Sequence, residues 1–211
     1  MDPKFELRQT ELADVARKTC FIGVRPGWQT NRAVSGTAFF VSNGTMLMTA
    51  GHMAPDGNRR IVAQYPGVPQ ARMFVEQLFL SPPIVDSFEC EFVATGLPNV
   101  DITILRVKGD YEADAYVSIE QKGFVAGEGV DVIGYPGHYG DHYISEMHGG
   151  NTDRKEIQDV GELFRRCELT VSYGSVVDTG GNMPMYQVST VVGMSGSPVV
   201  VAGKVVGNNP T

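Results

Sequence analysis

Short apolar runs, each ended by glycine, proline or asparagine, are the feature that most limits how this sequence can fold. The 211 residues include 25 glycines and 12 prolines, and valine-rich runs recur between them. Residues 35–41 and 45–50 form two such runs. The Asn43-Gly44 pair between them is a strong signal for a β-hairpin with a type I′ turn. The pattern therefore predicts many short strands rather than long helices.

A linker divides these strands into two blocks. Residues 108–120 contain a Lys-Gly-Asp sequence and then an acidic loop, and strand-like runs resume after them. We expect an N-terminal extension over residues 1–19, with a short helix at about residues 10–18. The β blocks should then cover residues 20–112 and 113–211. Two β blocks joined by a linker are the simplest organisation of such a chain.

Composition and charge exclude several classes of function. The net charge is −7 and no basic run stands out, so a nucleic-acid partner is disfavoured. No apolar stretch reaches the roughly 18–20 residues that a membrane span needs, so no membrane partner is expected. The polar N-terminus lacks the apolar core of a signal peptide. Three widely spaced cysteines favour free thiols in a reducing compartment, the cytoplasm. They are Cys20, Cys90 and Cys167.

Three residues with complementary chemistry lie beside predicted strands. Ser195 stands between glycines in a turn before a strand, and His52 follows the strand at 45–50. Asp101 opens an apolar strand, where a carboxylate is costly unless it is hydrogen-bonded. Acyl transfer to serine needs a hydroxyl, an imidazole that takes its proton and a carboxylate that orients the imidazole. Each residue alone more often has a structural role, but together they predict a catalytic triad in the cleft between the blocks.

The sequences around these residues resemble the motifs of the chymotrypsin-like (trypsin-like) serine peptidases. The motifs are Thr-Ala-Gly-His at 49–52, Asp-Ile-Thr-Ile-Leu at 101–105 and Gly-Met-Ser-Gly-Ser-Pro at 193–198. The resemblance covers about residues 20–207. It implies an all-β fold of two six-stranded antiparallel Greek-key barrels, the first at 20–112, with the active site in the cleft between them.

The resemblance also implies a role for each residue. Ser195 is the expected nucleophile, His52 the general base and then the general acid, and Asp101 the orienting carboxylate. The backbone N–H groups of Gly193 and Ser195 are expected to form the oxyanion hole. The implied protein is a serine endopeptidase that hydrolyses peptide bonds through an acyl-enzyme. Its partner is a peptide or protein substrate, and no cofactor is expected.

Two details place the sequence within this family. Secreted digestive members have an aspartate just before the nucleophile, which receives the new N-terminus after activation. Here that position is Met194, and no Ile-Val-Gly-Gly start is present, so this route of activation is not expected. Residues 133–137 and 186–190 resemble the glutamyl endopeptidase branch. The sequence is therefore most similar to the glutamyl endopeptidase, Deg-like and viral branches.

Substrate contacts are expected beside the serine and along the last strand. Ser189 and Thr190 should line the primary pocket, and the edge at 205–207 should pair with an extended substrate by strand addition. In the glutamyl branch a histidine just after that strand contacts the substrate carboxylate. This chain has two asparagines instead, so a polar pocket is predicted without a preference for glutamate. The expected substrate-binding residues are Ser189, Thr190, Val205, Val206, Gly207, Asn208 and Asn209.

A polar segment at residues 138–166 offers an alternative site. It contains His138, His142 and His148, and about residues 155–165 of it are expected to form a short helix. A tetrahedral metal site needs tighter spacing and a fixed scaffold. We therefore expect a solvated loop and no metal.

A second function remains open: a protease-like domain that acts as a binding or effector module. The family usually continues with another strand and a C-terminal helix, whereas this sequence stops at Thr211. Either the second barrel is shortened, or the domain belongs to a longer intracellular protein or a viral polyprotein. The sequence does not choose between these alternatives.

Overall fold

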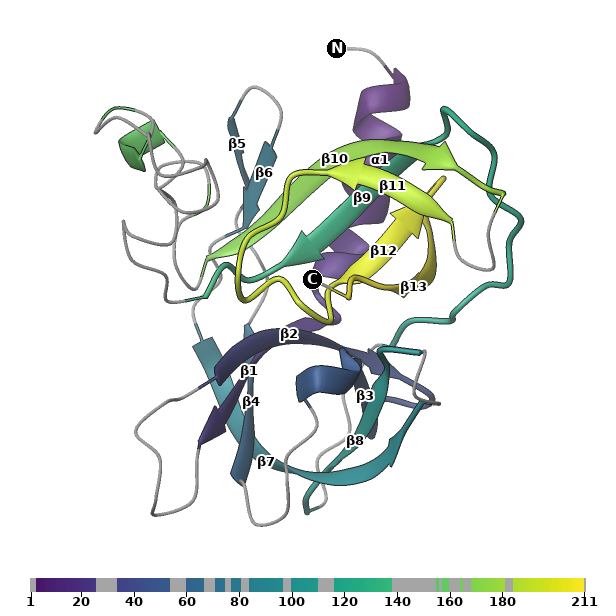
Figure 1. Ribbon diagram of the computed structural model, residues 1–211. Coiled ribbons are helices and arrows are strands. Elements are labelled where there is room, and N and C mark those ends of the chain that lie inside the picture. The colour runs from purple at the N-terminus through teal and green to yellow at the C-terminus, as the bar shows by residue number, and fades with distance from the viewer. Residues whose placement is uncertain are drawn as a thin grey trace.

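The structure is a computed structural model in which two antiparallel sheets and one N-terminal helix make up most of the fold (Figure 1). This confirms the prediction of a mainly β protein with a helix at its start. The residues that it describes are 3–25, 34–53, 60–66, 71–74, 77–80, 84–96, 100–109, 116–137, 155, 157–159, 164, 168–180 and 184–210.

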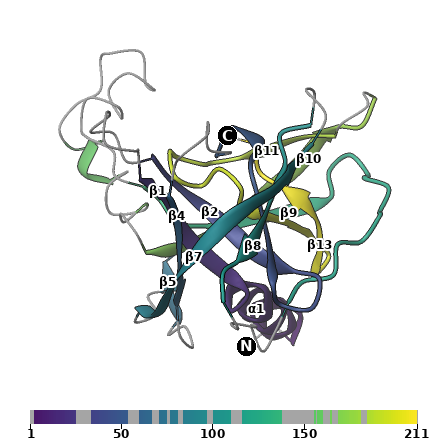
Figure 2. The same cartoon turned by 90° about the horizontal axis from the view of Figure 1, so that it is seen from below.

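The first sheet is a closed barrel in which β4 pairs back onto β1. Its strand order is β1-β2-β3-β8-β7-β4, and every pair is antiparallel. In Figure 2 the same barrel is seen from below, beside the end of helix α1. The strands are β1 (Thr19–Arg25), β2 (Val34–Val41), β3 (Met46–Thr49), β4 (Arg60–Pro66), β7 (Ile84–Thr95) and β8 (Thr103–Val107).

Among the described residues the second sheet has seven strands: six lie in the order β13-β12-β9-β10-β6-β5, and the seventh, β11, pairs with β10. A six-stranded second barrel is therefore not confirmed, and it stays a prediction, as does Greek-key connectivity. The strands are β5 (Ala71–Phe74), β6 (Gln77–Leu80), β9 (Gly129–Gly134), β10 (Leu169–Asp178), β11 (Met185–Val188), β12 (Pro198–Val201) and β13 (Lys204–Asn208).

One hairpin of the first block joins the second sheet. Residues 72–80 read as a single strand, but β5 and β6 pair with each other and β6 pairs with β10. No glycine or proline lies between residues 71 and 80. Because these residues are the main signals of a turn, the sequence pattern conceals the hairpin.

Two other local predictions changed in detail. The hairpin of β2 and β3 is present, but its turn spans residues 42–45 rather than two residues, with Ser42, Asn43 and Gly44 all at positive φ. Helix α1 covers Pro3–Ala16 rather than residues 10–18. Proline is well tolerated in the first helical turn, where its missing N–H is not needed.

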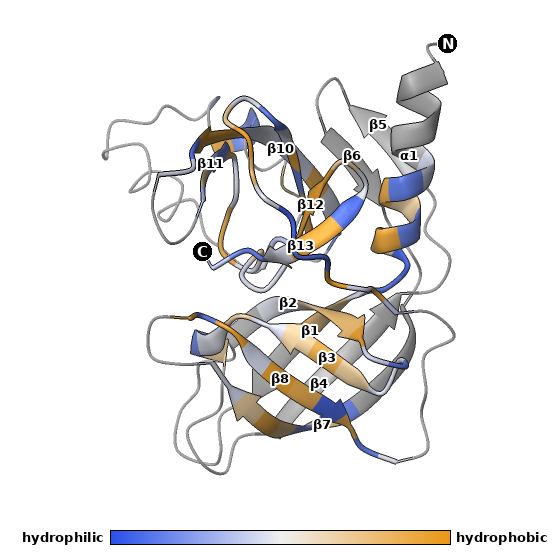
Figure 3. Cartoon of the chain, turned by 90° about the vertical axis from the view of Figure 1, so that its right-hand side faces the viewer, coloured by the Kyte–Doolittle hydropathy of each residue, from blue (hydrophilic) through white to orange (hydrophobic). Residues whose placement is uncertain are grey.

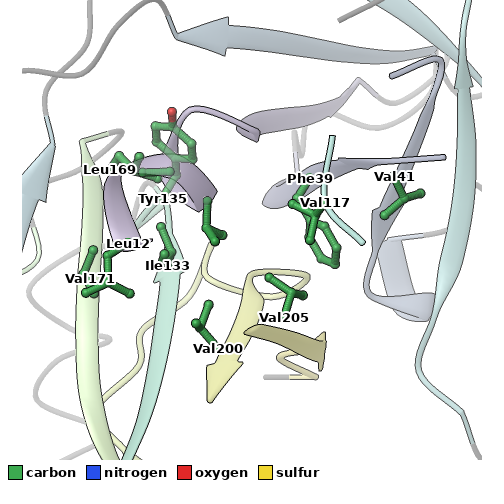
Figure 4. Packing of buried hydrophobic residues seen from close by; sticks show 12 residues of the cluster. Leu12, Phe39, Val41, Val117, Ile133, Tyr135, Leu169, Val171, Val200 and Val205 are labelled. Atoms are coloured by element: carbon green, nitrogen blue, oxygen red, sulfur yellow. The ribbon is translucent and has the colours of Figure 1, made fainter. Parts of the chain in front are cut away.

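A shared apolar cluster holds the helix and both sheets together (Figure 4). Leu12 of α1, Phe39 of β2 and Ile133 of β9 are all buried in it. Each sheet also has its own buried cluster. Figure 3 shows how apolar residues dominate β8 and β12.

Part of the predicted linker is bound to both sheets. The N–H of Val117 donates to the carbonyl of Phe40 at 2.8 Å, and the N–H of Glu120 donates to the carbonyl of Val205 at 2.9 Å. Residues 116–120 therefore bridge β2 and β13 instead of running free between the blocks. Among the described residues no helix is long and apolar enough to span a membrane.

We expect Leu12→Ala to lower the free energy of unfolding by about 2–4 kcal/mol, because it leaves a cavity where the helix meets both sheets. Urea denaturation followed by circular dichroism measures the change. Val125→Ala is the control, since Val125 is 65% exposed and its loss should cost less than about 0.5 kcal/mol. Equal effects of the two substitutions would contradict the role of α1 in the shared cluster.

Candidate active site

His52 and Asp101 are hydrogen-bonded to each other at one end of the first barrel. His52 lies in the short 3₁₀ helix η1 (Gly51–Met53) after β3, and Asp101 lies two residues before β8. These ends are adjacent because β3 and β8 pair with Thr49 opposite Thr103. The Asp101 carboxylate contacts Nδ1 of His52 at 2.9 Å and accepts the His52 backbone N–H at 2.8 Å. The two contacts fix both the ring and the backbone of the histidine.

The Ser195 loop, residues 193–197, packs against the strand that leads to His52. Gly196 has φ +85°, and a Cβ atom there would lie 2.3 Å from Thr49 Oγ1 and 2.8 Å from the Ala50 nitrogen. Only glycine fits such a close approach at positive φ. The loop belongs to the second sheet, whereas Thr49 and Ala50 precede His52 in the first. The structure thus brings the loop that carries Ser195 to the barrel end that carries His52.

The carbonyl groups of Val192 and Met194, which precede Gly193 and Ser195, both accept hydrogen bonds from the protein backbone. Val192 O accepts the N–H of Gly137 at 2.7 Å, and Met194 O accepts the N–H of Ser197 at 3.1 Å. In a trans peptide the following N–H points the opposite way. The N–H groups of Gly193 and Ser195 therefore face away from these partners. Within the described part of the chain, nothing accepts a hydrogen bond from either of them.

The side chain of Met194 fixes the Ser195 loop to the apolar core of the second sheet. Its side chain is fully buried and belongs to the apolar cluster of the second sheet, with Val191, Val199 and Val201. The loop is therefore held by apolar burial at this position, where the sequence has a methionine instead of an acid.

A cavity of about 860 Å³ opens between the two sheets beside His52. His52 and Asp101 line one end of it, and most of its remaining wall is apolar. Val100 and Ile102 come from the first barrel, and Phe124 comes from the segment before β9. The other lining residues are Gly51, Thr95, Gly96, Pro184, Tyr186, Val199, Val206, Gly207, Asn208 and Pro210.

The two asparagines at the end of the last strand are hydrogen-bonded to the site: Asn208 is the last residue of β13 and Asn209 follows it. Asn208 lines the cavity, and its Nδ2 donates to the Asp101 carbonyl at 3.0 Å, across the two sheets. Asn209 is 2% exposed, and its Nδ2 donates to the Met194 carbonyl at 3.3 Å. Its backbone makes two more hydrogen bonds to the Ser195 loop. The Asn209 N–H donates to the Ser197 carbonyl at 2.7 Å, and the Asn209 carbonyl accepts the N–H of Gly196 at 2.8 Å.

Tyr186 was not expected to take part in this arrangement. Its hydroxyl donates to Oδ1 of Asn209 at 2.9 Å. Burial raises the pKa of Tyr186 to about 12, so the hydroxyl stays protonated and remains a donor. Little in the sequence indicated this role for Tyr186, because a tyrosine in a strand usually packs in the apolar core.

The other expected substrate residues lie in different settings. Ser189 is exposed and Thr190 is half-buried, both between β11 and the Ser195 loop. Val206 and Gly207 line the cavity. Val205 is buried, and its carbonyl already accepts the N–H of Glu120. The Val205 carbonyl on the edge of β13 is therefore already paired with Glu120. A substrate strand would have to pair with β13 after Val205.

Several predicted features fall outside the described residues. His138, His142, His148 and Cys167 are among them, as is most of the helix expected at 155–165, of which residues 155 and 157–159 are helical. In the described ranges there is no group of three potential metal ligands. Cys20 and Cys90 are buried free thiols, and burial raises the pKa of Cys20 well above its usual value.

We expect Gly193→Ala to lower the free energy of unfolding by about 3 kcal/mol. Gly193 has φ +97°, and a Cβ atom would lie 2.1 Å from the Gly137 nitrogen. Gly123→Ala is the matched control, because nothing lies within 4 Å of its Cβ position. Chemical denaturation of both variants gives the comparison. If the Gly193 variant is as stable as the Gly123 variant, the loop can accommodate a side chain at residue 193, and the prediction is wrong.

Comparison with known proteins adds the family. Residues 36–207 match the family described as trypsin-like peptidase domain. The chain is similar to the crystal structure of Deg5, with 14% identity and a TM-score of 0.64, over 100% of this chain and 87% of that one. It is also similar to a serine endoprotease from Yersinia pestis, with 16% identity and a TM-score of 0.58, over 95% of this chain and 56% of that one. No curated protein matches.

The two similar structures share the fold, whereas the family match spans most of the sequence and contains the motifs around His52, Asp101 and Ser195. The chain therefore belongs to the family of trypsin-like peptidase domains, and as a peptidase it acts on peptides or proteins.

Proposed function

We propose that the protein cleaves peptide bonds through an acyl-enzyme on Ser195, with His52 as the base and Asp101 as the orienting carboxylate. The observation that carries this proposal is the double hydrogen bond from His52 to Asp101, through Nδ1 and the backbone N–H. With Nδ1 directed at the carboxylate, Nε2 is the ring nitrogen left to receive a proton.

In the first step Ser195 Oγ attacks the carbonyl carbon of the scissile bond, and its proton passes to Nε2 of His52. The carbonyl oxygen becomes an oxyanion and accepts hydrogen bonds from the N–H groups of Gly193 and Ser195. The C–N bond then breaks, and the amine leaves with the proton from His52. Water attacks the acyl-enzyme by the same sequence, and the acid product and free Ser195 result.

Asp101 acts by orientation and charge. Its carboxylate holds the tautomer in which Nδ1 carries the proton, and it stabilises the imidazolium that forms when Ser195 loses its proton. Asn208 supports Asp101 from the other sheet through the hydrogen bond to its carbonyl. The N–H groups of Gly193 and Ser195, which have no acceptor among the described residues, supply donors that need no reorganisation during the reaction. This is the efficient way to stabilise an oxyanion.

We place the substrate along the cavity between the sheets. An extended peptide would pair with β13 at Val206 and Gly207, and its primary side chain would reach Ser189 and Thr190. Hydroxyl groups favour a polar side chain there. The apolar wall beside His52, which includes Val100 and Phe124, would contact the neighbouring substrate side chains.

A fluorophosphonate probe tests the proposed nucleophile directly. We expect one probe adduct at Ser195, located by mass spectrometry of peptides, and no adduct in Ser195→Ala. Ser172→Ala is the matched control, because Ser172 is a buried serine on β10 and its loss should leave labelling intact. Unlabelled but folded wild-type protein would favour the alternative of a peptide-binding module without catalysis.

Asp101→Asn should slow the same labelling reaction by about 10⁴-fold. Its amide oxygen can still accept the His52 backbone N–H, so the fold should remain, but its NH₂ group favours the wrong imidazole tautomer. The labelled fraction of the protein, measured in reactions stopped at a series of times, gives the rate constant of labelling. Glu91→Gln, which removes only an exposed ion pair with Arg106, is the control. A loss of less than about tenfold would argue against Asp101 as the orienting group.

A further inference from the structure

Thr37 is a buried residue of the first barrel whose polar groups meet the Ser195 loop of the second sheet. It lies in β2 and has no exposed surface. Its backbone N–H donates to the Ser195 carbonyl at 2.9 Å. Its hydroxyl lies 2.9 Å from the Gly193 carbonyl and 2.8 Å from the backbone nitrogen of Tyr135. One threonine thus contacts both residues of the proposed oxyanion hole.

The direction of each hydrogen bond follows from the chemistry of the groups. The N–H of Tyr135 can only donate, so the Thr37 oxygen accepts there. The Gly193 carbonyl can only accept, so the single hydroxyl hydrogen of Thr37 points to it. The hydroxyl therefore joins three chain segments: β2, the residue after β9 and the Ser195 loop.

Gly193 needs such an external restraint. It has φ +97°, and glycine adopts many other backbone conformations at little cost. The peptide group before Gly193 is held by the bond from Gly137 to the Val192 carbonyl. The peptide group after Gly193 is held by the Thr37 hydroxyl, which donates to the Gly193 carbonyl, and by the Met194 N–H, which donates to the Val191 carbonyl at 3.1 Å. Without that hydroxyl, this peptide group keeps the Met194 bond but loses the bond to the Gly193 carbonyl. The backbone of Gly193 is then less firmly held, and with it the direction of the Gly193 N–H.

We propose that Thr37 is a positioning residue of the oxyanion hole, whose hydroxyl fixes the direction of the Gly193 N–H across the interface between the two sheets. This inference rests on the proposed function of Ser195. Thr37 does not touch the substrate; it acts through Gly193. Because the oxyanion exists only in the transition state, the residue should affect the rate of reaction more than the binding of substrate.

The hydroxyl is isolated by comparing Thr37→Ser with Thr37→Ala. Both variants lose the methyl group and therefore share the loss of packing, and they differ only in the oxygen. The control is Thr19→Ala, since Thr19 is equally buried and its hydroxyl donates to the Val15 carbonyl, away from the site. If Thr37→Ala does not fold, Thr37→Cys replaces it, because a thiol occupies a similar volume but hydrogen-bonds weakly.

The readout is the rate constant of fluorophosphonate labelling across a range of pH, with thermal melting measured for each variant. In this reaction Ser195 Oγ bonds to phosphorus, fluoride leaves and the serine proton passes to His52, while the phosphoryl oxygen takes the place of the oxyanion. We expect Thr37→Ser and Thr19→Ala to label within about threefold of wild type. Thr37→Ala should label about 10–100-fold more slowly, somewhat less than the loss of a whole oxyanion donor. The pH of half-maximal labelling should not change.

Two results would overturn the positioning role. Equal rates for Thr37→Ser and Thr37→Ala would show that the hydroxyl does nothing for the reaction. A slower rate with a shifted pH midpoint would place the effect on His52 rather than on the oxyanion hole. Failure of the proposed function is a separate result, because wild type and Thr19→Ala would then also remain unlabelled.

Discussion

The apolar cluster between α1, the first barrel and the second sheet is the constraint on which the site depends. His52 and Asp101 belong to one sheet and Ser195 to the other, so their relative position is set by how the sheets pack. Leu12, Phe39 and Ile133 meet in that cluster from three different elements. Close packing of such side chains resists displacement, because a small shift opens voids or forces overlaps. The helix is therefore part of the scaffold of the site, although it lies far from the motifs in sequence.

Hydrogen bonds between the sheets refine this arrangement. Asn208 reaches the Asp101 carbonyl, and Thr37 reaches the carbonyls of Gly193 and Ser195. These contacts are mostly buried, where a hydrogen bond left unmade costs more than it would in water. Apolar packing thus brings the two sheets together, and the polar contacts select one relative placement of the reacting groups.

Local motifs in the sequence were sufficient to propose His52, Asp101 and Ser195 as site residues, because each lies in a short stretch with its own composition. The two apolar runs that become β3 and β8 were predicted as strands, but their pairing, which brings His52 to Asp101, is visible only in the structure. The sheet membership of β5 and β6 could not be anticipated, since no turn residue separates them and their partner β10 is far away in sequence. The hydrogen bonds of Thr37 were equally hidden: a threonine in a strand usually indicates only β propensity. Its partners become visible only once the sheets are packed.

The buried side chain of Met194 has a consequence for how the loop responds to its surroundings. A charged residue at this position would tie the shape of the loop to a counter-charge, and so to protonation and to ionic strength. A thioether packed among valines carries no charge and is not screened by salt. The free energy that the Met194 side chain contributes to holding the loop is hydrophobic, and hydrophobic burial weakens on cooling. Temperature, rather than acidity or salt, is therefore the variable to which this anchor is most sensitive.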